Sequence, residues 1–141
     1  QSIPGVCVQS ESVQLLSASP YRPVYPAAPA DRRPVYGVRR WWIDPENWAR
    51  FNQLSFEGVW PALDHMGHRV LGQFRHLATT TPLETINLAG YHDVAHWQAT
   101  RNPAAHGVPA DLVERFSELV RERQSLVSRT FVRLMTAHWP E

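Results

Sequence analysis

The sequence predicts one α+β domain in which strands and helices follow the order β-α-β-β-α-β. Four short runs of β-branched and aromatic residues predict strands. Two amphipathic stretches separate the first run from the second and the third from the fourth, and they predict helices. The chain has 141 residues, enough for one hydrophobic core that needs no metal or disulfide.

The first predicted strand covers residues 35–43, with the sequence VYGVRRWWI. It ends at Asp44, which we expect to cap a helix whose first residue is Pro45. Apolar residues then recur every three or four positions, which is typical of a helix that lies on a sheet. We expect Pro61 to kink this helix and Gly67 to end it.

The second and third predicted strands, residues 69–77 and 83–91, flank the turn sequence TTTP and should form a hairpin. Asp93 is expected to cap a short helix that continues to Arg101. The Asn-Pro pair that follows should break the helix, so the second helical region is predicted in two pieces.

A longer helix should begin at Pro109, and the last strand should cover residues 127–135. The complete order is that of the ferredoxin-like split βαβ arrangement with an antiparallel sheet. Helices then cover only one face of the sheet. We expect two copies to pair through the bare face as a dimeric α+β barrel, whose interior would be a ligand cavity.

Residues 1–34 are predicted to form an N-terminal arm with a proline-rich linker. Val6, Val8, Val13 and Leu15 suit a short edge strand or hairpin arm. The prolines that follow repeat every three residues, which is also the period of polyproline II; they are Pro20, Pro23, Pro26 and Pro29. The segment is either an arm laid across the body or the partner subunit, or a ligand for a proline-binding module.

Composition narrows the function classes. The net charge is +1 and the arginines are scattered among acidic residues, so we expect no nucleic-acid partner. All 14 basic residues are arginine, which excludes a lysine Schiff base and a phosphate-loop lysine. Cys7 is the only cysteine, and no apolar run approaches the length of about 20 residues that a membrane-spanning helix needs. We therefore expect a soluble, cytoplasmic protein with no membrane partner.

Four stretches resemble, in their order and spacing, the NIPSNAP family of dimeric α+β barrel proteins: VYGVRRWWIDPENW, HMGHRVLGQF, PLETINLAGYHDVAHW and LVSRTFVRLMTAHWP. The resemblance implies a barrel domain at residues 35–141 and a homodimer. Related dimeric barrels include cofactor-free oxygenases, polyketide cyclases, isomerases, lyases and haem-handling enzymes, so the reaction stays open. Asn87 and Ala89 stand where many members have histidine and tryptophan, which suggests a cavity remodelled for its own ligand.

The first and third strands carry candidate site residues. Side chains alternate between the faces of a strand, so Arg39 and Trp41 share a face, and the resemblance places both toward the cavity. Arg39 could hold a carboxylate, enolate or phenolate oxygen while Trp41 stacks on a ring, or it could form a salt bridge across the dimer. Asn87 and Tyr91 share a face of the third strand and could orient a polar substituent or bond each other.

The second strand has polar and apolar residues on both faces, so its inward face is left open. Phe74 and His76 lie on one face and Gln73 on the other. Phe74 and Gln73 are candidates for substrate contacts. His76 is a candidate for proton transfer, because histidine exchanges protons near neutral pH, or it is a solvent-exposed residue at a strand end.

The remaining histidines are weaker candidates. His92 and His96 are four residues apart and could in principle share a metal, but no third ligand lies nearby, so we expect no metal site. His65 and His68 flank a glycine and are interpreted as turn residues. Cys7 has no basic neighbour in sequence to lower its pKa, so it is not proposed as a nucleophile.

These residues favour an enzyme without a cofactor that acts by proton transfer, as a cyclase, isomerase or lyase, on a hydrophobic aromatic or polyketide-like intermediate. Arg39 would stabilise negative charge, Trp41 and Phe74 would pack the substrate, and His76 or Tyr91 would move the proton. A cofactor-free monooxygenase could use the same cavity. A non-catalytic ligand-binding or scaffold protein is the alternative from another class, and haem binding is a third.

Overall fold

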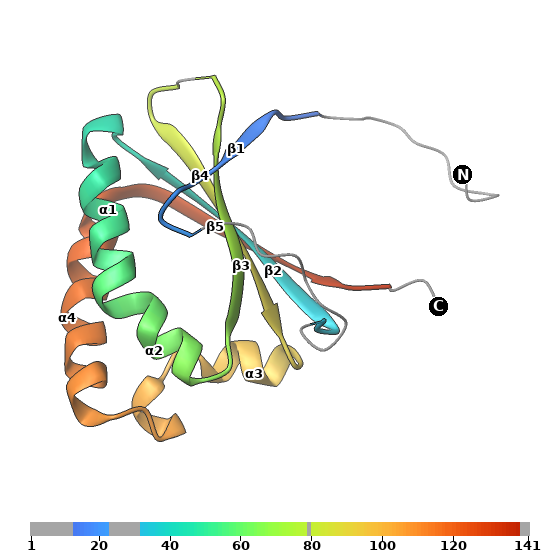
Figure 1. Cartoon of the computed structure of the whole chain (residues 1–141), viewed down its shortest axis with the longest axis vertical. Helices are drawn as coiled ribbons and strands as arrows, with labels where there is room; N and C mark the ends of the chain where they lie inside the picture. Colours follow the sequence, from blue (N-terminus) through green and yellow to red (C-terminus); the bar gives the residue numbers. More distant parts are fainter. Residues whose placement is uncertain (1–12, 23–31, 79, 139–141) are drawn as a thin grey trace.

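The computed structural model describes residues 13–22, 32–78 and 80–138. They form a five-stranded antiparallel sheet with helices on one side (Figure 1). The strands are β1 (Leu16–Ala18), β2 (Val35–Ile43), β3 (Arg69–His76), β4 (Leu83–Tyr91) and β5 (Val127–Thr136). The helical segments are η2 (Pro45–Asn47), α1 (Trp48–Leu54), η3 (Ser55–Val59), α2 (Trp60–His65), α3 (Val94–Ala99), η4 (Pro103–His106) and α4 (Ala110–Ser125).

The strands lie in the order β1-β3-β4-β2-β5. Apart from β1, this is the strand order of a ferredoxin-like fold, and the predicted β-α-β-β-α-β succession and one-sided helical layer are confirmed. In the register between β2 and β4, Arg39 lies opposite Asn87 and Trp41 opposite Thr85. Directly opposite residues point to the same face, so these four side chains lie on one side of the sheet.

The first helical region is less regular than predicted. Instead of one helix kinked at Pro61, the chain forms α1, the π-helical turn η3 and α2. Pro61 lacks an N–H and its ring crowds the preceding turn, so the irregularity falls before it. Gly67 ends the region with φ +75, as expected. Asp44 makes no side-chain capping bond, because the short turn closes on its backbone: the Asn47 N–H donates to the Asp44 carbonyl.

Part of the expected N-terminal arm belongs to the sheet. β1 pairs with β3 at the sheet edge, and the chain then continues toward the helices. The Ser19 N–H donates to the Gln73 carbonyl at 2.8 Å, and the Arg22 guanidinium donates to the Asp64 carboxylate at 2.8 Å. Residues 13–22 therefore connect the edge of the sheet to α2. The other residues of the predicted arm pattern lie outside the described residues; they are Val6, Val8, Pro23, Pro26 and Pro29.

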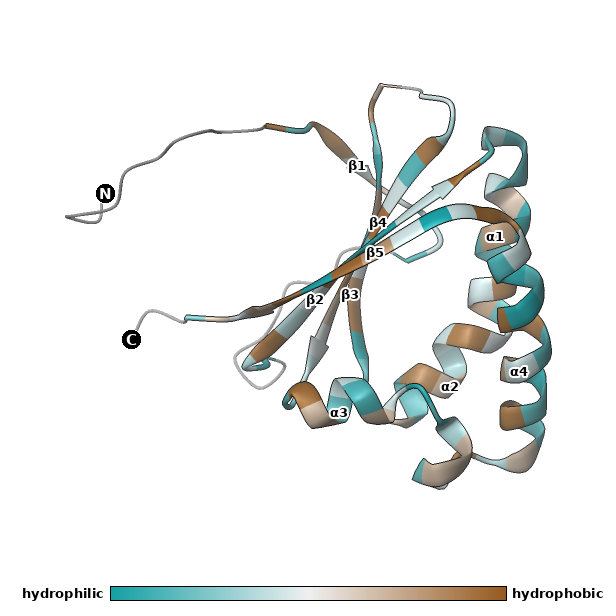
Figure 2. Ribbon diagram, turned by 180° about the vertical axis from the view of Figure 1, so that it is seen from behind, coloured by the Kyte–Doolittle hydropathy of each residue, from teal (hydrophilic) through white to brown (hydrophobic). Residues whose placement is uncertain are grey.

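The hydrophobic core lies between the sheet and the helices. One cluster packs Trp41 and Ile43 of β2 against Phe51 of α1 and Leu83 of β4. A second cluster is centred on Trp60 of α2 and includes Val70, Ala89 and Tyr91. Figure 2 shows that β5 carries both hydrophilic and hydrophobic residues along its length.

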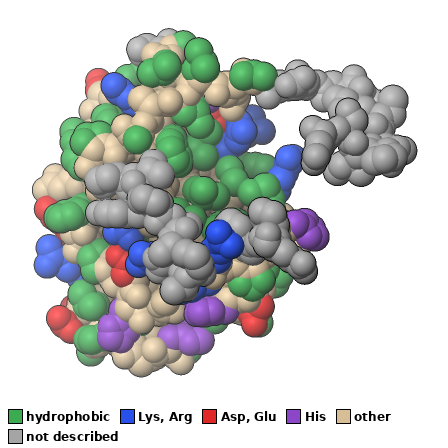
Figure 3. All heavy atoms as spheres, turned by 45° about the vertical axis from the view of Figure 1, so that its right-hand side comes forward, with side chains coloured by type: hydrophobic (Ala, Val, Ile, Leu, Met, Phe, Trp, Pro, Cys, Tyr) green, Lys and Arg blue, Asp and Glu red, His purple; other side chains and the backbone are tan. Residues whose placement is uncertain are grey.

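The opposite face of the sheet carries no helix among the described residues. Across β2 and β5 on this face, Trp42 lies opposite Arg129 and Arg40 opposite Phe131. Phe131 and Met135 are 46% and 40% exposed. Figure 3, seen partly from this side, shows hydrophobic side chains beside arginines. In the described part of the chain, no helix is both long and apolar enough to cross a membrane.

Candidate functional site

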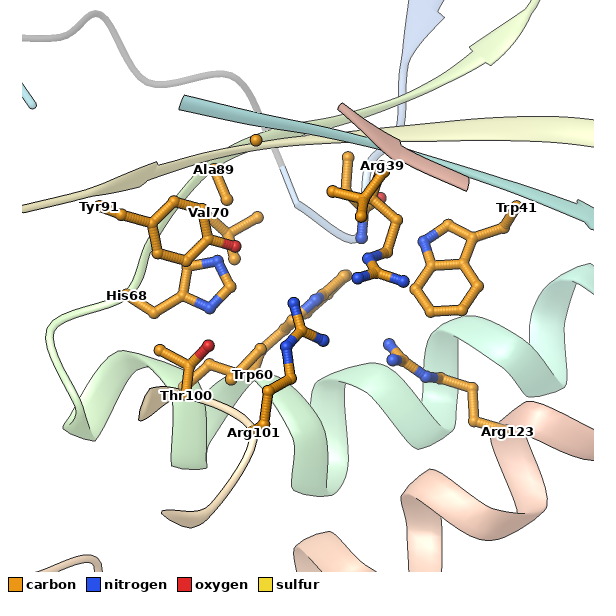
Figure 4. Close-up of a pocket in the computed structure, with 14 residues that line it drawn as sticks. Arg39, Trp41, Trp60, His68, Val70, Ala89, Tyr91, Thr100, Arg101 and Arg123 are labelled. Carbon is orange, nitrogen blue, oxygen red and sulfur yellow. The ribbon is translucent and has the colours of Figure 1, made fainter. Parts of the chain in front are cut away.

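A cavity lies between the helix-facing side of the sheet and the helices, within a single chain (Figure 4). It has two adjoining parts, which we name the inner compartment, with a volume of about 70 Å³, and the outer compartment, with a volume of about 380 Å³. Six residues line both parts: Arg39, Trp41, Leu63, Thr100, Arg101 and Arg123.

The inner compartment is enclosed by the central strands and by α2. Its own lining residues, beyond the six shared ones, come from β2, β4, β3, β5, α2 and the segment just before β3; they are Gly37, Trp60, His68, Val70, Asn87, Ala89, Tyr91 and Val132. Most of these side chains are buried. The compartment is therefore a largely buried space with a mixed polar and aromatic wall.

The outer compartment lies between α4 and the edge strand β5. Phe116 and Val120 of α4 form its apolar wall together with Val127, and Ser128 and Thr130 line it from β5. Ser128 and Thr130 are exposed. The outer compartment thus opens to solvent along β5 and adjoins the inner compartment.

Three arginines meet where the compartments join. Arg39 extends from β2, Arg101 follows α3, and Arg123 extends from α4, and their guanidinium groups point toward one another in Figure 4. No Asp or Glu occurs among the described residues that line either compartment. Arg39 donates one long hydrogen bond, of 3.4 Å, to Thr130 Oγ1. The site is therefore positively charged without a counter-charge of its own.

Arg123 is the most buried of the three, at 7% exposed. Its guanidinium carbon lies 4.8 Å from the Trp41 ring centroid, and that of Arg39 lies 5.1 Å from the same centroid. Arg123 Nη1 donates to Ser55 Oγ at 3.1 Å, and Ser55 in turn donates to the Phe51 carbonyl at 2.8 Å. The π-helical turn η3 therefore supplies the hydroxyl that holds Arg123.

Burial lowers the pKa of two of these arginines, Arg39 and Arg123. Desolvation, followed by repulsion from Arg39, lowers the pKa of Arg123 to about 9. Desolvation and then Arg101 lower the pKa of Arg39 to about 10. Both side chains are still cations near pH 7. A buried cation without a counter-charge costs free energy, so the site favours a bound anion, which a guanidinium holds through charge-assisted hydrogen bonds.

His68 and Tyr91 form the far wall of the inner compartment. Their ring centroids are 4.6 Å apart, and His68 is only 7% exposed. Desolvation, followed by Arg101, lowers the pKa of His68 to about 3, so its imidazole is neutral near pH 7. Burial raises the pKa of Tyr91, with Arg101 and Arg39 acting in the opposite direction. The wall thus presents a neutral imidazole beside a neutral phenol.

Several buried polar atoms on this side of the sheet have no hydrogen-bond partner among the described residues. They include both ring nitrogens of His68, Trp41 Nε1, Asn87 Oδ1, Arg123 Nε and both side-chain polar atoms of Gln73. Buried polar atoms in proteins are normally hydrogen-bonded, and each exception needs an explanation. A polar molecule bound in the cavity would provide partners for those that line it.

Solved structures share this architecture. A NIPSNAP family protein from Agrobacterium tumefaciens is 15% identical, with a TM-score of 0.56 over 74% of this chain and 85% of that one. An uncharacterized NIPSNAP domain protein from Burkholderia xenovorans is 14% identical, with a TM-score of 0.58 over 76% and 99%. The chain has the NIPSNAP fold. No family model and no curated protein sequence matches it significantly.

A further NIPSNAP family protein from Agrobacterium tumefaciens, described as having unknown function, is 12% identical, with a TM-score of 0.53 over 74% of this chain and 88% of that one. Identities this low establish the fold alone. The resemblance read from the sequence is therefore confirmed as a NIPSNAP fold, and the chemistry must come from the cavity of this chain.

Four of the predicted site residues come together in the cavity: Arg39, Trp41, Asn87 and Tyr91. Their expected location was wrong, however. We expected them inside a barrel formed by the bare faces of two copies, but they face the helices of their own chain. Trp41 shows why, since it packs against Phe51 of α1 and is 6% exposed.

The predicted residues of β3 divide between the faces. Gln73 lies opposite Asn87 and is fully buried on the helix-facing side, although it does not line the cavity. Phe74 lies opposite Ile86, and His76 follows it on the bare face, where His76 Nε2 lies 3.0 Å from Glu84 Oε2. Phe74 and His76 therefore do not share a cavity with Arg39 in one chain, which corrects the predicted catalytic set.

Sequence reasoning missed three residues of the site, His68, Arg101 and Arg123. The interpretation of His68 as a turn residue was wrong: it directly precedes β3 and its ring turns inward. Arg123 had a detectable signal, since it lies three positions after Val120 and so continues the apolar stripe of the last helix. An arginine in such a stripe indicates a buried charge.

His92 and His96 do not form a metal site. The His92 N–H donates to His96 Nδ1 at 3.1 Å, and His96 Nε2 lies 2.8 Å from the Met66 carbonyl. Both ring nitrogens of His96 are therefore used within the protein, and Nε2 must carry the hydrogen. Across residues 13–22, 32–78 and 80–138, no group of three potential metal-ligating side chains occurs.

Proposed function

We propose that this protein is an enzyme without a cofactor that transfers a proton on a small organic anion with a hydrophobic body, bound between its sheet and its helices. One observation carries the proposal: Arg39, Arg101 and Arg123 converge on a cavity whose described lining includes no carboxylate. Preorganised cations in a desolvated site stabilise negative charge that develops on a substrate oxygen. A cyclisation, isomerisation or elimination next to a carbonyl group develops such charge.

The residues divide into two roles. The three arginines hold the anion and stabilise an enolate-like oxygen, while Trp41 provides a flat wall. Tyr91, whose pKa is raised by burial, can donate a hydrogen bond or a proton. His68 can accept a proton, and a bound negative charge would raise its pKa from about 3.

Deuterium exchange tests the proposal even where the final product of the reaction is not identified. A panel of aryl-substituted keto acids is incubated in deuterated buffer with the protein, and exchange at the carbon beside the carbonyl is followed by NMR. We expect the wild type to accelerate exchange for at least one member of the panel. Arg39→Ala and Tyr91→Phe should each lower that exchange rate at least about tenfold. Arg121→Ala, at an exposed position of α4, is the control.

Binding without turnover is the second candidate function. The low pKa of His68, about 3, makes its imidazole a weak base in the free protein and favours this alternative. Tight binding of a panel member with exchange no faster than in buffer would establish it and overturn the enzyme. Oxygen uptake with the same panel would instead indicate a cofactor-free monooxygenase.

We also propose that the protein is a homodimer that pairs through the bare face of the sheet. A shallow groove of about 520 Å³ there is lined by Trp42, Phe131, Met135 and other residues of β2 and β5. Exposed apolar groups of this kind are typical of protein interfaces. The single cysteine, Cys7, supports a cytoplasmic location, which cell fractionation would test.

A further inference from the structure

We infer that the cavity takes its ligand head first: a small anionic head lies in the inner compartment, and the hydrophobic body, including any aromatic ring, lies in the outer compartment between α4 and β5. The ligand class is an organic acid whose carboxyl or keto-acid group is joined to its ring by a short flexible chain. The inference rests on the proposed function only for the anionic character of the ligand.

Size decides the orientation. The inner compartment has a volume of about 70 Å³, whereas a dry protein cavity that holds benzene measures about 150 Å³. An aromatic ring therefore does not fit there, but a carboxyl group with one or two neighbouring atoms does. The outer compartment, at about 380 Å³, is within the usual range of about 300 to 1,000 Å³ for small-molecule pockets.

The chemistry of the walls agrees with the sizes. Beyond the arginines, the inner compartment presents the nitrogens of His68 and the Oδ1 of Asn87, all without partners among the described residues. The N–H of the neutral His68 can donate to a carbonyl oxygen beside the carboxylate, whereas its other ring nitrogen and Asn87 Oδ1 are acceptors and suit an O–H group on the head. Arg39 and Arg123 line both compartments, so the negative charge lies where the compartments join.

The outer compartment suits the body of the ligand. Phe116, Val120 and Val127 make its wall apolar, and the exposed Ser128 and Thr130 mark its opening. A molecule that enters along β5 with its charge leading meets the arginines first and leaves its ring against α4. In a benzoate the carboxylate is attached directly to the ring. Its head therefore cannot enter the inner compartment unless the ring enters too, and the ring does not fit there.

Photoaffinity labelling tests the orientation directly. The probe is γ-phenylbutyrate with a trifluoromethyldiazirine at the para position of its ring, crosslinked to the wild-type protein and mapped by tryptic mass spectrometry. We expect label on peptides 116–121 and 124–129, suppressed by excess unlabelled γ-phenylbutyrate. Peptide 76–101 contains residues of both compartments, so label on it is assigned to single residues by fragmentation, and label on Asn87, Ala89 or Tyr91, which line only the inner compartment, would overturn the inference. Label that the competitor does not suppress would also overturn it.

Two filling variants provide an independent test by titration calorimetry. Val120→Phe narrows the outer compartment and should lower the affinity for γ-phenylbutyrate by at least about tenfold. The affinity for propionate, which has no ring, should stay the same. Ala89→Leu narrows the inner compartment and should lower the affinity for both acids. Val94→Phe, at a position of α3 that is 55% exposed, is the matched control.

The opposite pattern, with γ-phenylbutyrate sensitive to Ala89→Leu but not to Val120→Phe, would place the ring inside and overturn the inference. The outcome is independent of turnover. If the protein binds γ-phenylbutyrate head first but does not accelerate deuterium exchange, the proposed reaction is wrong and this inference stands. Label on residues that line only the inner compartment would overturn this inference and leave the proposed reaction untouched.

Discussion

The imidazole of His68 lies against the phenol ring of Tyr91, with a centroid separation of 4.6 Å and an angle of 31° between the ring planes. The pair joins the segment that ends the first helical region to the end of β4, to one side of the arginines of the cavity (Figure 4). A histidine held there stays uncharged, because a proton on it would be both desolvated and repelled by Arg101. The relationship links the stability of the protein to pH.

His68 should make the protein less stable in mild acid. An unfolded histidine has a pKa of about 6.5, while His68 in the fold has a pKa of about 3. Between these values the unfolded state binds more protons, so the free energy of unfolding falls as the pH falls. One such proton contributes a slope of up to about 1.4 kcal/mol per pH unit.

Urea unfolding at several pH values in this window measures the effect. His68→Gln should flatten the dependence of unfolding free energy on pH by most of that slope. His106→Gln removes an exposed histidine of η4 and gives the baseline for losing one titratable group. If His68→Gln and His106→Gln show equal slopes, the buried neutral state of His68 is wrong.

Arg123→Met should separate stability from ligand binding. Burying the unpaired cation costs several kcal/mol, more than its stacking on Trp41 and its bond to Ser55 return, at about 1 to 2 kcal/mol each. Methionine keeps the apolar contacts with Trp41 and Phe51. We expect a melting temperature equal to or above that of the wild type.

The same variant should lose stabilisation by γ-phenylbutyrate. A ligand at 100 times its Kd raises the free energy of unfolding by about 2.7 kcal/mol, and in a domain of this size each kcal/mol raises Tm by about 2 to 4 °C. Thermal scans with and without the acid should show this rise for the wild type and for Arg121→Met, but less than a third of it for Arg123→Met. A full ligand-induced rise in Arg123→Met would exclude Arg123 from the site.

The strand bounds were predictable and the identity of the inward face was not. β4 covers the predicted residues 83–91, because a run of β-formers between turn residues is a local signal. In β2, Arg39 and Trp41 point one way and Arg40 and Trp42 the other, so alternation alone cannot say which pair the helices cover. That choice depends on which tryptophan fits against the helices, a tertiary contact.

The site residues that the sequence missed are missed for similar reasons. His68 and Arg101 belong to connecting segments, where no periodicity indicates the direction of a side chain. The residue type of His76 makes it a candidate for the proton carrier beside Tyr91, yet its position in β3 puts it beside Glu84 on the bare face. Residue type suggests proton transfer, which stays a prediction, and packing determines which histidine lies in the cavity.

Ser55→Ala should weaken anion binding through Arg123. The Ser55 hydroxyl is fully buried and accepts the hydrogen bond from Arg123 Nη1 at 3.1 Å. Without it the guanidinium has fewer fixed positions, and we expect the affinity for γ-phenylbutyrate to fall about three- to tenfold, roughly the value of one hydrogen bond. Ser117→Ala, an exposed serine of α4 that also bonds the carbonyl four residues earlier, is the control. If the wild type and Ser55→Ala have equal affinities in calorimetry, only stacking on the neighbouring aromatic rings holds Arg123.

The proposed dimer should depend on the bare face of the sheet. Phe131 is 46% exposed and lies opposite Arg40 on that face. Replacing it with glutamate places a charge where two apolar surfaces would meet, and desolvating that charge on association costs more than the lost contact alone. Native mass spectrometry and light scattering should show a wild-type dimer, a Phe131→Glu monomer and a dimer for Val94→Glu on α3. Because the cavity lies within one chain, the Phe131→Glu monomer should still bind γ-phenylbutyrate. A monomer that binds no acid would mean instead that the partner subunit completes the site.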